Sequence, residues 1–254
     1  MEIKDRYYEA IKNRRSRRKF ETTPIDKSKL KDLNELISKI NEESKMNIQL
    51  IEDGSKILNG FRASYGMISG KMSVVALIGN EHDKDLKEKA GYYGEYIVLE
   101  AVSLGLGTCW VGGTFNKKKC NSMIEINDNE NLVCIIAIGN VKSEKSYKEK
   151  LLARSGNNKK AFDEILLDGA EDAPEWIENG INMAIMAPSA MNKQPVGYSY
   201  RKGVVNSFFI KNGLGYEEVD SGISMAHFEI GAYQCGVKGN WERKREKYIF
   251  NLKK

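Results

Sequence analysis

Residues 91–113 read GYYGEYIVLEAVSLGLGTCWVGG and carry the strongest structural signal in the chain. Apolar side chains recur through this stretch at helical spacing, which predicts a long helix over residues 83–104. Gly105 and Gly107 follow, and glycine readily takes the left-handed conformation that ends a helix. The next segment, TCWVGGTFN, predicts a turn.

A later part of the chain is similar to this stretch. Residues 91–110 align with residues 222–241 at a constant offset of 131. The alignment matches four identical pairs, which are Gly91 with Gly222, Ala101 with Ala232, Gly105 with Gly236, and Trp110 with Trp241. Coincidence is the alternative explanation for so few identities. The shared helix–glycine–tryptophan ending predicts two related halves that pack as a pseudo-dimer.

Periodicity and helix-ending residues predict the other elements. Helices are expected over residues 2–14, over 30–40 with Asp26 or Ser28 as the cap, from Asp172 to the stop at Pro188, and over 224–235. Buried strands are expected over residues 48–51, 74–79, 132–139, 198–200, 208–211 and 248–252. The polar, lysine-rich residues 141–160 are expected to link an N-terminal half, 1–150, to a C-terminal half, 151–254.

Composition excludes several classes of protein. The 254 residues are 41% hydrophobic and 30% charged, with only 4 Pro, which is not typical of a disordered or collagen-like chain. Apolar runs fall well short of the roughly 18 residues that span a membrane, and the N-terminus has no apolar core typical of a signal peptide. The 4 Cys and 2 His include no C-x-x-C pair, so no zinc site is expected. We therefore expect a soluble protein of the cytoplasm, where free thiols persist.

The net charge of +5 is mild, but basic residues cluster in the sequence RRSRRKF at residues 14–20. The planar guanidinium of arginine binds phosphate oxygens in pairs. The cluster is equally compatible with a phosphate-bearing cofactor, with RNA or with a plain basic surface. Residues 12–19, which contain six basic residues, have no interleaved aromatic residue, and this argues against stacking on bases.

Two further motifs could bind a flat ligand. APSAMNKQP, residues 187–195, combines small residues with two amide side chains and two prolines; the alternative is a helix stop followed by a turn. In TCWVGG, residues 108–113, glycine backbone could direct N–H groups at a ligand; the alternative is a helix end with a core Trp.

Together these motifs resemble the flavin-dependent nitroreductase family, and more closely its subgroup with two nitroreductase-type halves fused in one chain. The resembling stretches are residues 14–20, 91–113, 159–166, 187–195 and 219–232. The resemblance implies an α+β nitroreductase-like fold, with a mixed, mostly antiparallel sheet flanked by helices. It also implies one FMN per chain, bound at the interface of the two halves, so that a monomer acts as its own dimer.

The resemblance also implies roles for particular residues. Arg14 and Arg15 would bind the FMN phosphate, Ser16 the ribityl chain, and Arg18 the N1 and O2 edge, where reduction places negative charge. The other expected FMN-binding residues are Lys159 and Lys160 at the phosphate, Gly112 as the donor to N5 with Trp110 and Gly113 beside it, and Pro188, Ser189, Ala190, Asn192 and Gln194 along the pyrimidine side. No catalytic residue and no metal are expected. His227 and Asp220 are expected to have packing and capping roles.

The function implied is an FMN-dependent oxidoreductase. NADH or NADPH would deliver hydride to flavin N5, and a nitroaromatic, a quinone or a similar small molecule would accept it; no nucleic acid or membrane partner is expected. Residues 60–70 are expected to border the acceptor pocket. Dehalogenation or flavin-fragmenting chemistry is an alternative within the enzyme class. An FMN carrier or sensor without turnover and an RNA-binding module are alternatives outside it.

Overall fold

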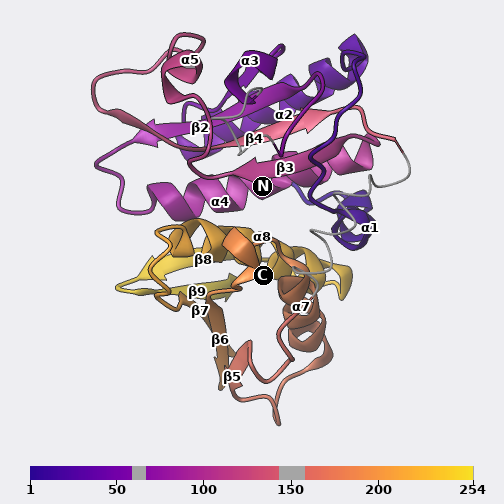
Figure 1. Cartoon of the computed structure of the whole chain (residues 1–254). Helices are drawn as coiled ribbons and strands as arrows, with labels where there is room; N and C mark the ends of the chain where they lie inside the picture. The colour runs from indigo at the N-terminus through magenta and orange to yellow at the C-terminus, as the bar shows by residue number, and fades with distance from the viewer. Residues whose placement is uncertain (59–66, 143–157, 254) are drawn as a thin grey trace. The chain divides into compact units, whose positions relative to one another are not determined.

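The computed structural model describes residues 1–58, 67–142 and 158–253 (Figure 1). Most of the expected acceptor-pocket stretch and of the expected linker lie outside these ranges. Contacts divide the chain into two units. Unit 1 comprises Met1, Asn13–Leu86 and Tyr96–Ser155, and unit 2 comprises Glu2–Lys12, Lys87–Glu95 and Gly156–Lys254.

Unit 1 contains a four-stranded antiparallel sheet. Its strands, in spatial order, are β1 (Gln49–Ile51), β2 (Ser73–Asn80), β4 (Glu130–Gly139) and β3 (Gly107–Val111). Its helices are α2 (Lys27–Ser44), α3 (Ser55–Leu58), α5 (Lys117–Asn121) and the second part of α4 (Leu86–Ser103). The strands are apolar on both faces, since Val74 and Val75 are both fully buried. One face packs with α3 and α5 into a continuous hydrophobic core.

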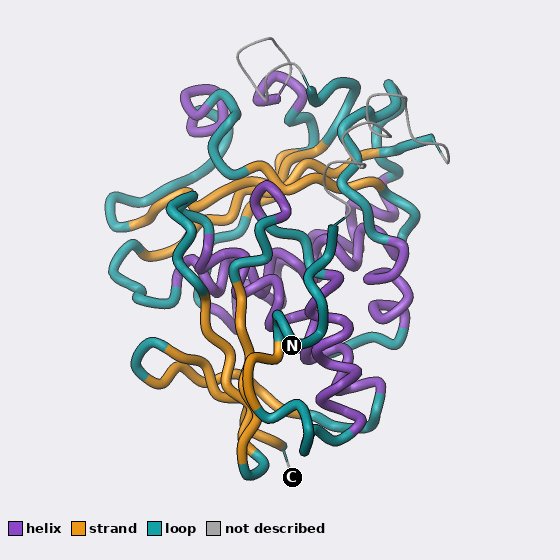
Figure 2. The backbone as a smooth tube through the Cα atoms, turned by 60° about the horizontal axis from the view of Figure 1, so that its bottom comes forward, coloured by secondary structure: helices purple, strands orange, loops and turns teal. Residues whose placement is uncertain are grey.

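Unit 2 contains a five-stranded sheet in the order β5 (Leu166–Asp168), β6 (Val196–Arg201), β7 (Val204–Phe209), β9 (Lys247–Leu252) and β8 (Gly239–Lys244). Only the β5–β6 pair is parallel. Short turns join β6 to β7 and β8 to β9, and they are teal between orange strands in Figure 2. Helices α7 (Glu175–Met186) and α8 (Glu217–Gln234) pack on the sheet, as does a cluster of aromatic rings centred on Phe228. Helix α1 (Arg6–Asn13) belongs to this unit except for its last residue.

Apart from α3 and α5, the strands and the long helix follow the same order in two parts of the chain. Elements β1, β2, α4, β3 and β4 are followed later by β6, β7, α8, β8 and β9, and both sheets place the corresponding strands in the same spatial order. Helices α4 and α8 have 18 residues each and begin 131 positions apart, at Leu86 and Glu217. The offset found in the sequence is therefore the offset between two equivalent helices.

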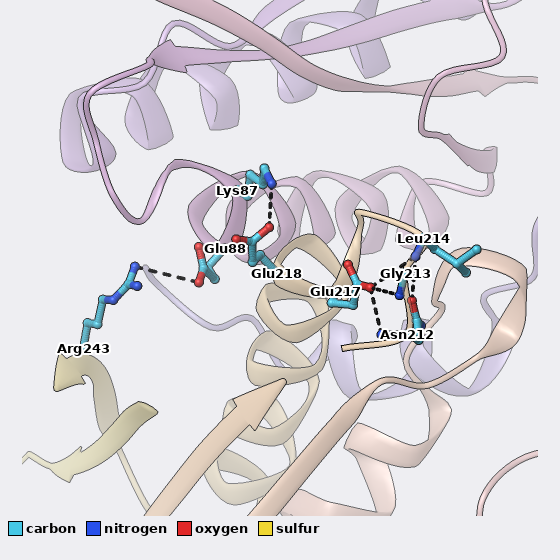
Figure 3. A network of polar contacts seen from close by, with 8 residues as sticks. All are labelled: Lys87, Glu88, Asn212, Gly213, Leu214, Glu217, Glu218 and Arg243. Carbon is cyan, nitrogen blue, oxygen red and sulfur yellow. Dashed lines mark hydrogen bonds and ion pairs between the residues drawn. The ribbon is translucent and has the colours of Figure 1, made fainter. Parts of the chain in front are cut away.

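Within unit 2, the first part of α4 crosses α8 with the two backbones in contact. A Cβ at Gly91 would lie 2.0 Å from the carbonyl oxygen of Val219, and a Cβ at Gly222 would lie 2.0 Å from that of Glu88. The two contacts are equivalent, because Gly91 and Gly222 are 131 residues apart and so are Glu88 and Val219. Any residue larger than glycine would force the helices apart. Beside the crossing, Lys87 binds Glu218 at 2.6 Å (Figure 3).

The strands and one helix end confirm the sequence predictions closely. The strands expected at 48–51, 74–79, 132–139, 198–200, 208–211 and 248–252 are β1, β2, β4, β6, β7 and β9, each shifted or extended by a few residues. Gly105 is left-handed at φ +78° after α4, as expected. Gly107 is not, because it begins β3, where a Cβ would lie 2.3 Å from the Val141 side chain. Residues 108–111 are consequently strand rather than turn.

Three helix starts differ from the prediction. Helix α1 begins at Arg6, after a tight turn in which the Tyr7 N–H donates to the Lys4 carbonyl. In α7 the cap position belongs to Pro174 rather than Asp172, and the proline carbonyl accepts the first helical hydrogen bonds. Proline has no backbone N–H, but at the start of a helix this group would have no intrahelical acceptor in any case, so no hydrogen bond is lost.

Helix α8 begins seven residues earlier than expected, at Glu217. Its first turns contain Ser221 and Gly222, both poor helix formers, so the sequence pattern conceals them. The helix is stabilised there by Glu217, whose carboxylate accepts hydrogen bonds from the backbone N–H groups of residues 212–214 (Figure 3). Strand β8 was also missed by the sequence analysis.

The helix crossing predicts a large loss of stability on Gly91→Ala or Gly222→Ala. Each added methyl would meet backbone, which cannot move aside, so we expect each variant to lose about 3 kcal/mol of unfolding free energy. Gly105→Ala is the control, because nothing lies within 4 Å of its Cβ position and only its positive φ is strained; it should cost about 1 kcal/mol. Urea unfolding midpoints at unchanged slope measure the difference. Equal losses in all three variants would contradict the backbone contact.

Candidate functional site

The basic segment RRSRRKF lies beside β3 in unit 1. Ser16 forms a parallel bridge with Thr108, and the Arg17 N–H donates to the Thr108 carbonyl at 2.8 Å. Phe20 is buried and anchors the end of the segment. The sequence predicted that these residues bind FMN but not their conformation, and the structure shows them extended along a sheet edge.

This position places the segment beside the strand that carries another of the expected FMN-binding residues, Trp110. The bridge to Thr108 aligns the segment with the strand that carries Trp110 and leads into Gly112 and Gly113. Arg14 is only 9% exposed, whereas Arg15 is exposed. Guanidinium groups and glycine backbone on one strand edge can bind an anionic, planar molecule.

In unit 2, the APSAMNKQP motif forms a loop with an unusual backbone. Three of its residues, Met191, Asn192 and Gln194, have φ values of 50°, 55° and 46°. For residues with a side chain, this left-handed conformation costs about 1 kcal/mol or more each. Strain of this kind persists only where surrounding contacts enforce it, and it is concentrated at functional sites.

Hydrogen bonds from neighbouring residues enforce the loop conformation. Lys159 Nζ donates to the Ala187 carbonyl and Lys160 Nζ to the Gln194 carbonyl, both at 2.9 Å. Within the loop, the Gln194 N–H donates to Ser189 Oγ at 2.8 Å. The Asn192 side chain donates to the Asn158 carbonyl at 2.9 Å. The loop is therefore held along its length by side chains from 158–160 and by its own.

Helix α8 holds the loop and the helix before it. The Ala190 N–H donates to both carboxylate oxygens of Asp220, each at 3.0 Å. Two turns further along α8, His227 Nδ1 contacts the carbonyl of Met183, in the last turn of α7, at 3.0 Å. Its Nε2 lies 2.9 Å from Glu95 Oε1, and both side chains of this pair are fully buried.

The environment of Asp220 changes its acidity. Burial raises the pKa of its carboxyl to about 7, the Ala190 N–H opposes this shift, and the charge of Glu217 adds to it. Glu217 itself behaves differently. Burial disfavours its charge, but the backbone N–H groups of residues 212–214 outweigh this effect and lower its pKa.

The predicted site residues therefore form two groups, each assembled within one unit. Unit 1 contains Arg14, Arg15, Ser16, Arg18, Trp110, Gly112 and Gly113, and unit 2 contains Lys159 and Lys160 bonded to the loop that carries Pro188, Ser189, Ala190, Asn192 and Gln194. In the second group, the Gln194 side chain is buried and accepts from the Lys160 N–H. Sequence analysis missed Asn158 and Glu95. Asp220 was expected to have a packing or capping role; its carboxylate accepts from the N–H of Ala190, the first residue of a short 3-10 turn, Ala190–Asn192.

No helix in the described part of the chain is long and apolar enough to cross a membrane.

Comparison with known proteins identifies the family of the chain. A family model described as "Putative TM nitroreductase" matches residues 6–232. The chain belongs to this nitroreductase family. No curated protein gave a significant match.

A solved structure shows the same fold. It is described as a "putative nitroreductase" from Thermotoga maritima MSB8, with a TM-score of 0.62 and 21% identity over 97% of this chain and 93% of that chain. Shorter matches include an FMN-dependent nitroreductase from Clostridium difficile R20291, with a TM-score of 0.42 and 22% identity over 54% of this chain and 90% of that chain. A "Putative NADH Oxidase" from Clostridium acetobutylicum has a TM-score of 0.44 and 21% identity over 54% and 89%. The fold is nitroreductase-like, with helices and largely antiparallel sheets.

The two histidines of the chain provide a matched test of the buried pair. His227→Ala would leave Glu95 buried without its imidazole partner, so we expect a loss of about 3–5 kcal/mol in unfolding free energy. His82, whose side chain is 78% exposed, is the control; His82→Ala should change stability by no more than about 0.5 kcal/mol. Thermal and urea unfolding measure both. Similar small losses would show that the pair contributes little.

Proposed function

We propose that this nitroreductase-family chain is an FMN-dependent oxidoreductase that passes hydride from NADH or NADPH to small acceptors such as nitroaromatics or quinones. The observation that carries the proposal is the 187–195 loop. Its strained left-handed turn is held in place by Lys159, Lys160 and Asp220. Such pre-organisation reduces the entropy lost when a ligand binds, and it is expected at a cofactor site.

The chemistry of the residues fits FMN. The phosphate is an anion, and the RRSRRKF segment offers guanidinium groups beside the hydroxyl of Ser16. We propose that Arg14 and Arg15 bind the phosphate, Ser16 the ribityl chain, and Arg18 the edge of the ring that gains negative charge. Lys159 and Lys160 also contact the loop carbonyls, so in this proposal they would hold the loop as well as attract the phosphate.

The ring requires flat surfaces and backbone donors. We propose that Pro188, Ser189, Ala190, Asn192 and Gln194 bind along its pyrimidine side and that the Gly112 N–H donates to N5, with Trp110 and Gly113 beside it. When bound, FMN supplies the chemistry, by accepting hydride from the nicotinamide and passing electrons to the acceptor. The chain binds and orients the reactants and excludes water, and no side chain has to act as acid, base or nucleophile.

We further propose that the chain is two nitroreductase-type halves, 1–150 and 151–254, acting as an intramolecular pseudo-dimer. The support is the shared order of elements in the two units and the equivalence of α4 and α8. RRSRRKF occurs only in the first half and APSAMNKQP only in the second. The proposal is therefore one FMN per chain, held jointly by the two groups.

The visible spectrum of the purified protein tests the function directly. We expect flavin absorbance bands, one FMN per 28.7-kDa chain, and bleaching when NADH or NADPH is added without oxygen. Bands that persist with both donors would favour a carrier without turnover. A colourless protein that takes up no added FMN would overturn the proposal.

Arginine variants test the cofactor-binding residues. Arg15→Ala and Arg18→Ala each remove a group proposed to bind FMN, and a hydrogen bond to a charged partner contributes about 1.5–3 kcal/mol. We expect at least about tenfold weaker FMN binding for each variant. Arg201→Ala is the control, because this arginine is exposed and pairs only at the surface with Asp168. Flavin fluorescence titration measures the affinities. Wild-type affinity in both variants would remove the segment from the site.

A further inference from the structure

Asp220 contacts the cofactor loop at one backbone group. Both of its carboxylate oxygens lie 3.0 Å from the Ala190 nitrogen, and the residue is only 4% exposed. A carboxylate that shares one N–H between two oxygens forms a charge-assisted bond, which is stronger than a bond to a neutral acceptor. The loop is therefore held at Ala190 more firmly when Asp220 is ionised.

Ala190 is the residue at which the strained turn begins. Met191 and Asn192 follow directly in the left-handed conformation, and the Lys193 N–H closes the turn on the Ala190 carbonyl at 3.1 Å. Ser189 accepts from Gln194 across the same turn. Loss of the bond at Ala190 would loosen the loop where its conformation is least favourable, while the bonds from residues 158–160 would remain.

The charges around Asp220 come from four segments of unit 2. Among the described charged groups, Glu217 on α8 is the one whose charge raises the pKa of Asp220. Glu217 is itself kept ionised by hydrogen bonds from the N–H groups of residues 212–214 (Figure 3). Lys159 and Lys160 are bonded to loop carbonyls, and Lys193 is exposed in the loop. The backbone carbonyl oxygen of Glu88, on α4, lies 2.0 Å from where a Cβ would stand at Gly222. The carboxylate of Glu88 lies 3.9 Å from the Arg243 side chain.

This environment places the ionisation of Asp220 near neutral pH. Burial and the neighbouring Glu217 disfavour the carboxylate, and the Ala190 N–H favours it, which leaves its pKa at about 7. A buried carboxyl with a pKa at its usual value would remain charged throughout the physiological range. Asp220 instead changes charge within that range.

We infer that Asp220 is a positioning residue that fixes the FMN-binding loop only in its ionised form, so that the protein releases FMN on mild acidification. The inference rests on the proposed function, since it concerns the same cofactor. Protonation of Asp220 would weaken the bond to Ala190, relax the left-handed turn and lower FMN affinity. FMN binding would in turn favour the ionised form by linkage.

Hydrogen exchange on wild-type protein without FMN tests the loop contact. The protection of the Ala190 amide, corrected for the intrinsic effect of pH on exchange, should fall about tenfold from pH 8 to pH 6, as expected for one group with a pKa near 7. Amides in the middle of α8 should keep their protection. Constant protection at Ala190 would overturn the inference, and this measurement needs no variant.

FMN titrations test the consequence for the cofactor. Asp220→Asn keeps one acceptor oxygen but never carries charge, so it imitates the protonated state. We expect its FMN affinity to be about tenfold below wild type at pH 8 and close to wild type at pH 6. The phosphate of FMN also titrates in this range, but equally in both proteins, so the ratio of affinities isolates Asp220. Asp128→Asn, an exposed aspartate in unit 1, is the control and should follow wild type at both pH values.

The outcomes separate this inference from the function on which it rests. An affinity ratio between wild type and Asp220→Asn that does not change with pH would overturn the role of Asp220 and leave the FMN assignment in place. A wild-type protein that binds no FMN at any pH would overturn the proposed function. The exchange of Ala190 would then still decide whether Asp220 fixes the loop.

Discussion

Helices α4 and α8 cross with backbone against backbone at Gly91 and Gly222, and the contacts along α8 depend on this approach. Because the helices are so close, Lys87 reaches Glu218, Tyr92 reaches Glu229, and Glu95 reaches His227. These contacts fix α8 in position and in rotation. Asp220 and His227 lie seven residues apart, which is about two turns, so they share one face of the helix. That face holds α7 at Met183 and the loop at Ala190.

The 187–195 loop is thus held in its conformation by residues that lie outside it. The strain at Met191, Asn192 and Gln194 is offset by bonds from Lys159, Lys160 and Asp220, which are contributed by two separate parts of the chain. A loop held in this way presents its amide groups without reorganisation when a ligand arrives. The FMN chemistry that we propose for this chain needs little more from a protein than such fixed positions.

The sequence predicted the elements whose signal is local. Buried strands show continuous apolar runs, and Gly105 ends α4 as glycine typically does. The start of α8 could not be predicted, because Gly222 weakens the helix signal and is present for a contact with a distant helix. The motif at 187–195 could also be found from the sequence, because its residues are consecutive. The bonds that hold it were not, since Lys160 and Gln194 are 34 residues apart, and Asp220 and Ala190 are 30 apart.

Lys87 and Glu218, which form an ion pair, occupy equivalent positions in their helices, since they are separated by the same offset of 131 residues. In an assembly of two identical chains, a residue that meets its own equivalent meets an identical side chain, and a charge there would repel itself. One gene that encodes both helices is free of that restriction, so a lysine can evolve on one side and a glutamate on the other. In this chain the contact joins a lysine to a glutamate, and it is attractive. Two helices of one chain can therefore carry opposite charges at a position where two identical chains would carry the same charge.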